Sequence, residues 1–395
     1  MFPPERIFPP SNDSRLDSAI QTWRKFEEGL KSTDRIGVVY HGDMDGLIGG
    51  TYVRRALLDR NRQGTHDIAT FWVKTEEYDF ASLRNWINDQ KLDKCVFTDI
   101  SLENHPATLD FVARNVRDQS FIFDHHILNA NVADYPNVML VNPTPHKLDD
   151  DQHAVPTFLF SYRLAIEKRL VFPEWLLVLC IFSEGVDSFF EKEVQDLLRI
   201  NFQVSEEQPV RAAYKSTVLP KISSLVRASF SGSVKSDVPL KLMDSVATGE
   251  IKTPEQLETK LSPLFQLAAK NIAKGISNLV EKWKYELKRN PQGGPIVLIP
   301  IDGPNSVAGP VASILRGYFP DKVIVTYVKV IGKVVVELRT NNSTHLNLAA
   351  ILGRVSNNVN LINYGGHPMA AGALIDESVS DGFFANLTTE ILKDL

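Results

Sequence analysis

Aspartate and histidine residues stand directly after short apolar segments in the first half of the chain. The residues are His41, Asp43, Asp45, Asp99, Asp124, His125 and His126. A further carboxylate, Asp187, follows the apolar segment 176–182. If the segments before the others are parallel strands, their carboxyl ends meet at one edge of a sheet and bring these side chains into one site. Carboxylate and imidazole ligands suit Mn²⁺, and also Zn²⁺ or Fe²⁺, so we expect a metal site there.

This set is larger than one tetrahedral ion needs, which favours two ions. Two ions roughly 3.5–4 Å apart would share one carboxylate, hold a phosphate and lower the pKa of a bridging water. Gly42 and Gly46 would let the loop turn tightly and let a phosphate or metal approach the backbone. The alternative for any single aspartate is a turn residue or a helix N-cap. Coincident capping at four places is the weaker explanation, and the pair His125-His126 has no capping role.

A second group of candidate residues stands near the C-terminus. Gly365 and Gly366 allow close backbone approach, and N–H groups there can hold an anion. His367 adds a titratable donor. Arg339, at the end of an expected strand, offers a guanidinium suited to bidentate phosphate contact. A glycine turn beside a surface arginine explains the same residues, so the pattern alone leaves both interpretations open.

Short apolar runs alternate with helical segments in the first half of the chain and again near its end. The spacing predicts a helix over 16–32 and buried strands at 36–40, 68–73, 95–98, 120–123 and 138–141. We therefore expect an N-terminal α/β domain built on a doubly wound parallel sheet. A helical middle follows, with helices over 189–204, 208–230 and 255–289. After a turn-rich break at 290–295 we expect a smaller α/β domain with a mixed sheet, with strands at 296–300, 323–330 and 333–340 and helices at 307–318 and 347–355.

The composition is that of an ordinary globular protein. The chain has 395 residues and a net charge of −5, which excludes a strongly basic protein that coats nucleic acid. Its two cysteines cannot form a disulfide framework or a thiolate zinc site, and a reducing, cytoplasmic compartment fits best. The longest apolar run, 175–182, is too short to span a membrane, and the proline-rich start is not a signal peptide.

The motifs, taken in order, resemble those of the DHH phosphoesterase superfamily with its C-terminal DHHA1 domain. They are His41-Gly-Asp43-Met-Asp45-Gly46, Asp99, Asp124-His125-His126, Asp187 and Gly365-Gly366-His367. The form His-x-Asp-x-Asp-Gly, and Val141-Asn142-Pro143 after the Asp-His-His run, are most similar to the RecJ-type single-strand exonuclease branch. Oligoribonucleases and family II pyrophosphatases instead place a histidine where this chain has Val39.

The resemblance implies a role for each candidate residue. It implies that two Mn²⁺ ions, with Mg²⁺ as an alternative, are bound by Asp43, Asp45, Asp99, His125 and Asp187, with His41 as a further ligand. Asp99 would bridge the ions. His126 would stand beside the scissile phosphate, and we expect Asp124 to support the metal shell, so both are assigned to catalysis. Substrate phosphates would be held from the second domain by Arg339, Gly365, Gly366 and His367. Hydrolysis would use a water activated by the two ions.

The resulting hypothesis is a manganese-dependent nuclease acting on single-stranded or short nucleic acid, with no membrane partner. Basic residues of the helical middle would wall a channel for this substrate, at Arg211, Lys215, Lys221, Arg227, Lys235 and Lys241 and again at 270–289. Two alternatives stay open: hydrolysis of a small phosphorylated molecule, such as a cyclic dinucleotide, a phosphoadenosine nucleotide, polyphosphate or pyrophosphate, and a non-catalytic scaffold. The expected domains are a catalytic domain at 1–189, a helical connector at 190–290 and a substrate-binding domain at 291–395. The oligomeric state does not follow from the sequence.

Overall fold

The computed structural model of the chain describes residues 14–60, 67–73, 76–102, 105–126, 135–143, 155–187, 189–205, 207–231, 237–289, 294–303, 307–330 and 332–395. The chain divides into two compact units, Met1–Ala269 and Lys270–Leu395, and this division falls inside the long helix α11 (Pro254–Arg289). The predicted boundaries at 189/190 and 290/291 remain predictions. The predicted break at 290–295 lies outside the described residues except for its last two positions.

The first unit contains a five-stranded, wholly parallel sheet with the strand order β2-β1-β3-β4-β5. Its strands are β1 (Arg35–His41), β2 (Asp67–Val73), β3 (Lys94–Thr98), β4 (Gln119–Phe123) and β5 (Val138–Val141). Most residues of the three inner strands are buried on both faces, which is why their sequences are continuous apolar runs rather than alternating ones. All five strands lie where the sequence predicts them, and the predicted fold class is confirmed.

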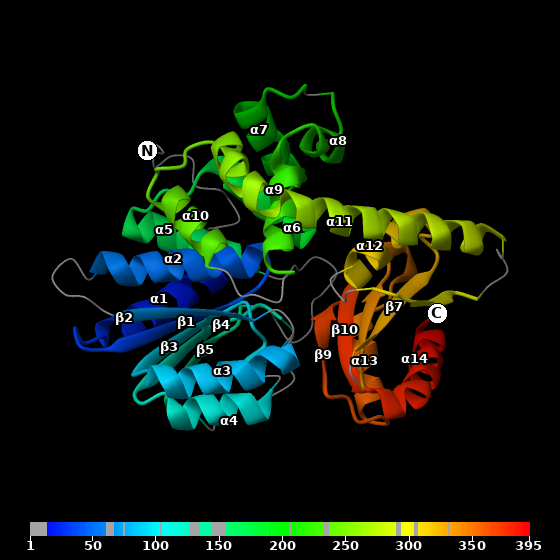
Figure 1. The fold of residues 1–395 in the computed structure, drawn as a ribbon, viewed down its shortest axis with the longest axis horizontal. Coiled ribbons are helices and arrows are strands. Elements are labelled where there is room, and N and C mark those ends of the chain that lie inside the picture. The colour runs from blue at the N-terminus through cyan, green and yellow to red at the C-terminus, as the bar shows by residue number, and fades with distance from the viewer. Residues whose placement is uncertain are drawn as a thin grey trace. The chain divides into compact units, whose positions relative to one another are not determined.

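Helices cover both faces of this sheet (Figure 1). One face, which includes Val38 and Tyr40, packs against α1 (Ser14–Glu28), α2 (Met44–Arg60) and α5 (Thr157–Lys168). The other face, which includes Val39 and Phe97, packs against α3 (Glu76–Gln90) and α4 (Pro106–Asn115). The sheet therefore packs between two apolar cores, which fix the positions of the carboxyl ends of its strands.

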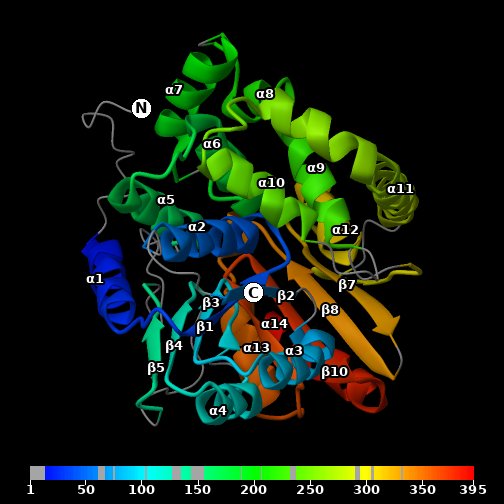
Figure 2. The ribbon, with the colours of Figure 1, turned by 60° about the vertical axis from the view of Figure 1, so that its left-hand side comes forward.

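Five further helices of the first unit gather over α2 and α5, on the side away from the sheet (Figures 1 and 2). They are α6 (Glu174–Glu184), α7 (Glu191–Phe202), α8 (Val210–Lys215), α9 (Leu219–Ser229) and α10 (Val238–Ala247). Their buried residues belong to the same apolar core as α2. The predicted helix 208–230 is two helices, because the chain turns at residues 216–218 and Pro220, which lacks an N–H group, fits only the first turn of a helix.

The second unit contains a mixed sheet with the strand order β6-β7-β8-β10-β9. Its strands are β6 (Ile296–Pro300), β7 (Val323–Val330), β8 (Lys333–Arg339), β9 (Asn363–His367) and β10 (Ala370–Asp376), and only β6 and β7 are parallel neighbours. One face packs against α13 (Leu348–Ser356) and α14 (Ser380–Asp394), and the other against α12 (Ala308–Tyr318) and the second half of α11. The predicted mixed sheet is confirmed, but strands β9 and β10 and helix α14 were not predicted.

Short 3₁₀ turns at Asn342–Thr344 and Glu377–Val379 complete the regular structure of the described part of the chain. No helix among these described residues is both long enough and apolar enough to cross a bilayer.

Candidate metal centre

Neighbouring strand ends bring the predicted metal ligands of the first unit together. His41 ends β1, Asp99 follows β3, and Asp124 follows β4. Main-chain hydrogen bonds continue past the strand ends: the N–H of Asp99 donates to the carbonyl of Phe123 (2.9 Å), and that of Asp124 to Val141 (3.2 Å). The sheet therefore fixes the backbone beneath the site as well as the order of its ligands.

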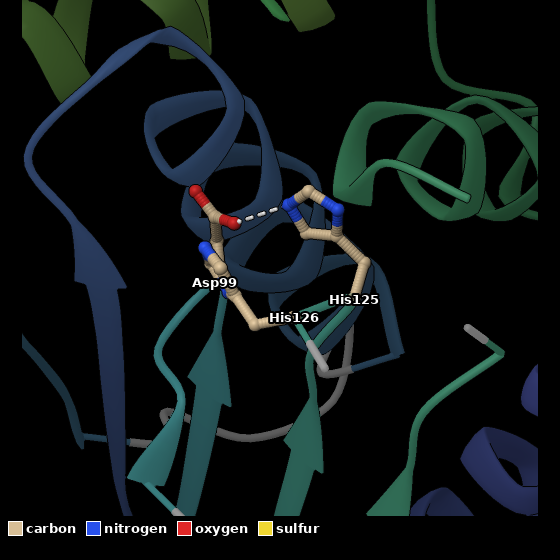
Figure 3. Close-up of side chains that lie close together, drawn as sticks. All are labelled: Asp99, His125 and His126. Carbon is tan, nitrogen blue, oxygen red and sulfur yellow. Dashed lines mark hydrogen bonds and ion pairs between the residues drawn. The ribbon is translucent and has the colours of Figure 1, made fainter. Parts of the chain in front are cut away.

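Three overlapping groups of side chains could each hold a cation. The groups are Asp99, His125 and His126; His41, Asp43 and Asp99; and Asp45, His125 and Glu184, and within each group the ligand atoms lie within 4.8 Å of one another. Figure 3 shows Asp99 beside both adjacent histidines. Asp99 and His125 each belong to two groups, and the carboxylate of Asp99 has two oxygens that two neighbouring ions could share. The ligand atoms are carboxylate oxygens and imidazole nitrogens, with no thiolate. Oxygen ligands fit Mn²⁺ and Mg²⁺, and the imidazole ligands favour Mn²⁺ over Mg²⁺.

Asp99 lies at the centre of these groups. Its Oδ1 is 3.0 Å from Nε2 of His125, and its Oδ2 is 3.7 Å from Nδ1 of His41. The side chain is only 3% exposed. Its φ of 61° lies in the left-handed region, which aspartate tolerates better than most residues, and such backbone conformations gather at functional sites.

His41 and Asp43 form an ion pair at the edge of the cluster. Nδ1 of His41 is 2.8 Å from Oδ2 of Asp43, and the N–H of Gly46 donates to Oδ1 of Asp43 (2.9 Å). Burial alone lowers the pKa of His41, but the carboxylates of Asp43 and Asp99 outweigh it and raise this pKa well above its ordinary value. A histidine must be neutral to bind a metal, so a cation here would replace the imidazolium proton.

Asp45 is both a helix cap and a member of the cluster. Its two oxygens accept hydrogen bonds from the N–H groups of Thr157 (2.8 Å) and Phe158 (2.6 Å), at the start of α5. Its Oδ2 also lies 3.6 Å from Nε2 of His125. Burial, and then the neighbouring carboxylates of Asp99 and Asp43, raise the pKa of Asp45 well above its ordinary value. The two explanations that the sequence left open for this residue are therefore compatible.

Asp124 belongs to none of the three groups but contacts His126, a member of the first. Its Oδ1 is 2.7 Å from Nδ1 of His126, and its Oδ2 accepts the His126 N–H at 3.3 Å. A carboxylate on one ring nitrogen fixes the tautomer and leaves the other nitrogen for the site. Asn142, from the Val-Asn-Pro motif, donates to the carbonyl of His126 (2.7 Å) and anchors the same turn. Asp124 thus positions His126.

Glu184 is the member of the site that the sequence reasoning missed. It is the last residue of α6 and joins Asp45 and His125 in the third group. Burial, and then the charges of Asp45 and Asp43, raise its pKa well above the ordinary value of a glutamate. A usable signal was present, because Glu184 directly ends the most apolar helix in the chain, where a carboxylate has no role in packing.

Asp187 lies three residues beyond this helix and belongs to none of the three groups found in the described residues. The guanidinium of Arg211 holds both its oxygens, with distances of 2.6 Å (Nε to Oδ2) and 3.1 Å. Asp187 is 8% exposed in this ion pair. Its role as a metal ligand stays a prediction, and Arg211 already occupies one acceptor position on each oxygen.

Three of the six cations expected to line a channel in the first unit have acidic partners. Besides Arg211, Lys221 pairs with Glu258, and Lys241 pairs with Asp237 at 2.6 Å. Lys235 lies outside the described residues. Arg227, in α9, differs, because no ion pair joins it to a described residue. Burial lowers the pKa of its guanidinium, and the negative charge of Asp43 opposes this shift. Lys215 likewise has no ion pair with a described residue, but Arg227 is the one of the two on which the charge of Asp43 acts, so we take Arg227 as the cation available to an anion near the cluster.

The predicted phosphate-binding residues lie in the second unit. Arg339 ends β8 with its side chain 18% exposed, and its guanidinium contacts Oε2 of Glu337 (2.9 Å) and Oγ of Ser313 (3.2 Å). The strand register places Arg339 and His367 on either side of Ala370, on neighbouring strands. Arg339 and His367 therefore occupy the same register position of the sheet, both paired with Ala370. Their action on a substrate at the metal cluster stays a prediction.

Gly365 and Gly366 lie within strand β9 rather than in an open anion-binding turn. Gly366 has a φ of 128°, and a Cβ atom added there would lie 2.4 Å from the carbonyl oxygen of Ala370. Glycine is therefore required at this position by the close pairing of β9 with β10. Nothing comparable constrains Gly365, where an added Cβ would meet open space.

Comparisons with known proteins agree with this architecture. Residues 294–394 match the model of the DHHA1 domain. RecJ from Thermus thermophilus in complex with Mn²⁺ is similar with a TM-score of 0.58 and 19% identity, over 96% of this chain and 55% of that one. The chain thus spans about half the length of that relative. An exonuclease RecJ bound to manganese is similar over 96% of this chain and 94% of that one, with a TM-score of 0.54 and 19% identity.

A DHH domain from a protein described as a member of a family of ribosomal proteins is also similar, with a TM-score of 0.58 and 14% identity, over 96% of this chain and 91% of that one. No curated protein sequence matches the chain. The solved structures share the fold, and the family model covers the second unit. The resemblance predicted from the motifs is thus confirmed: the chain carries a DHHA1 domain and has the fold of the RecJ-like DHH proteins.

Proposed function

We propose that the protein is a metal-dependent phosphoesterase that hydrolyses phosphodiester bonds of single-stranded or short nucleic acid. The observation that carries this proposal is the set of three ligand groups, which are linked because Asp99 and His125 each belong to two of them. His41, Asp43, Asp45, Asp99 and His125 would hold two Mn²⁺ ions, or Mg²⁺, with Glu184 beside them and Asp187 as a further ligand. Bound ions of this kind supply Lewis-acid activation of water and phosphate.

The chain's own residues have distinct tasks in this proposal. His126, oriented by Asp124, would present its Nε2 to the scissile phosphate and hold or deliver a proton there. Arg227 would contact the phosphate as a free guanidinium, which is suited to phosphate oxygens. Arg339 and His367 would bind the substrate from the second unit.

The electrostatics of the cluster argue against a non-catalytic scaffold. The carboxylates of Asp45 and Glu184 are pushed toward the protonated form by burial and by their acidic neighbours. An acidic cluster of this kind is costly unless cations neutralise it. A protein that served only as a scaffold would gain nothing from it.

Hydrolysis of a small phosphorylated molecule is the second candidate. The ion pairs of Arg211, Lys221 and Lys241 occupy three of the cations that were expected to line a channel for a long polyanion. A small substrate needs only the cluster and Arg227.

A cytoplasmic location also belongs to this proposal, since both cysteines are buried free thiols.

A hydrolysis panel tests the proposal. The panel contains 5-mers and 30-mers of DNA and RNA, a cyclic dinucleotide and polyphosphate, each with Mn²⁺. We expect cleavage of the oligonucleotides by the wild type and its loss in Asp99→Asn, with Asp196→Asn as the control because Asp196 is an exposed aspartate on α7. Cleavage of the small molecules alone would favour the second candidate, and no cleavage of any substrate would contradict a phosphoesterase.

A further inference from the structure

The second half of helix α11, residues 270–289, has one apolar face and one basic face. The apolar side chains Ile272, Ile276, Leu279, Val280, Trp283 and Leu287 pack against the second unit's own core. Tyr285 points away from that stripe and is 59% exposed. The ring of Tyr285 is therefore accessible on the solvent side of the helix.

The exposed face is strongly positive in a chain whose net charge is −5. Residues 270–289 contain six cations, Lys270, Lys274, Lys282, Lys284, Lys288 and Arg289, against the two carboxylates Glu281 and Glu286. Only Lys284 has an acidic partner among the described residues, Glu281 at 3.4 Å. The other five have no acidic partner in the described part of the chain and can contact phosphates.

Exposed aromatic rings stand among these cations. Cζ of Arg289 lies 5.4 Å from the ring centroid of Tyr285. Nζ of Lys284 lies 4.2 Å from the ring centroid of Tyr318, the last residue of α12, which is 50% exposed. Phosphate-binding cations interleaved with accessible rings are the combination that binds single strands, because the rings stack on bases.

We propose that this surface, which we call the α11 face (Lys282, Lys284, Tyr285, Lys288, Arg289 and Tyr318), binds single-stranded nucleic acid. A base stacks on Tyr285, and the lysine and arginine side chains contact the flanking phosphates. The inference rests on the proposed function and extends it to substrate grip outside the metal cluster. An acidic peptide would use the charges but not the rings, a duplex hides its bases from stacking, and a membrane would require more exposed apolar side chains than two tyrosines.

The test is fluorescence anisotropy of a labelled 12-mer of deoxythymidine with the full chain in EDTA, where hydrolysis is prevented. Tyr285→Ala should weaken binding about tenfold or more, the loss typical of one stacked base, while Tyr285→Phe should retain most of the affinity. Arg289→Ala should lower the slope of log affinity against log salt by about 0.7, the value for one phosphate contact on a single strand. Leu267→Ala is the control, since Leu267 is 74% exposed on the same helix but lies in the first unit.

Each result has a defined meaning. Equal affinity of Tyr285→Ala and the wild type, or equal affinity of the wild type for an abasic 12-mer and for the deoxythymidine 12-mer, would overturn the stacking surface. Preference for a duplex, an acidic peptide or anionic vesicles would overturn the choice of partner. Cleavage of oligonucleotides by the wild type with Mn²⁺, measured separately, decides the proposed function whatever the binding result.

Discussion

A methyl group added at Gly46 would collide with the end of strand β1. Its Cβ would lie 2.4, 2.6 and 2.7 Å from the carbonyl oxygen, the nitrogen and the Cα of His41, whereas ordinary contact begins at 3.4 Å. Backbone atoms cannot rotate away as a side chain can, so the segment 41–46 must shift by roughly 1 Å. That segment carries His41, Asp43 and Asp45, and the N–H of Gly46 itself donates to Asp43.

We therefore expect Gly46→Ala to lower both stability and activity. Overpacking of this kind costs about 1–3 kcal/mol of unfolding free energy. A displacement of about 1 Å at a reacting centre costs about 100-fold in rate. The measurements are urea unfolding, calorimetric Mn²⁺ titration and steady-state hydrolysis of an oligonucleotide.

Gly275→Ala is the matched control for this substitution. Gly275 is also helical, but an added Cβ there meets nothing within 4 Å, so alanine should stabilise the helix by about 1 kcal/mol. If Gly46→Ala matched Gly275→Ala in stability, Mn²⁺ affinity and rate, the tight loop would not be what holds the ligands in place.

Three further outcomes are expected. Asp124→Asn should reduce turnover at least about tenfold and leave the Mn²⁺ stoichiometry unchanged, because Asp124 orients His126 and belongs to no ligand group; loss of a metal equivalent in the titration would contradict that role. EDTA should abolish hydrolysis and Mn²⁺ should restore it better than Ca²⁺, since calcium prefers ligand shells made only of oxygen; full activity in excess chelator would rule out the metal mechanism. Arg339→Ala should lower kcat/KM and leave Mn²⁺ binding unchanged, and Arg339→Lys should restore part of the lost kcat/KM. A wild-type kcat/KM of Arg339→Ala on every active substrate would contradict a role for Arg339 in substrate binding.

The sequence predicted the first sheet well because its strands are buried on both faces. Continuous apolar runs such as 95–98 and 120–123 have no competing interpretation once turn residues bound them. The mixed sheet was harder, since strand β9 contains Gly365 and Gly366, and glycine is disfavoured in strands. Strand β9 forms because its pairing with β10 compensates for the low strand propensity of glycine. A local sequence pattern does not show such pairing.

The candidate site was predictable where ligands follow strands, and less so where they lie on helices. Asp99 and His125 come together because neighbouring parallel strands end side by side. Glu184 reaches the cluster from α6, whose packing position no local pattern reveals. The partnership of Asp187 with Arg211 joins two segments separated by 24 positions and by helix α7, so the sequence could suggest each residue but not the pair.

The double attachment of Asp45 has a consequence for how such a chain could change over time. Its carboxylate joins the first turn of α2 to the start of α5, 112 positions away, through two main-chain hydrogen bonds. A substitution there would release the first turn of α5 as well as remove a ligand. Selection for folding alone would then retain Asp45. In a descendant that had lost its chemistry, His41 would change before Asp45, and Asp45 would remain as a trace of the former site.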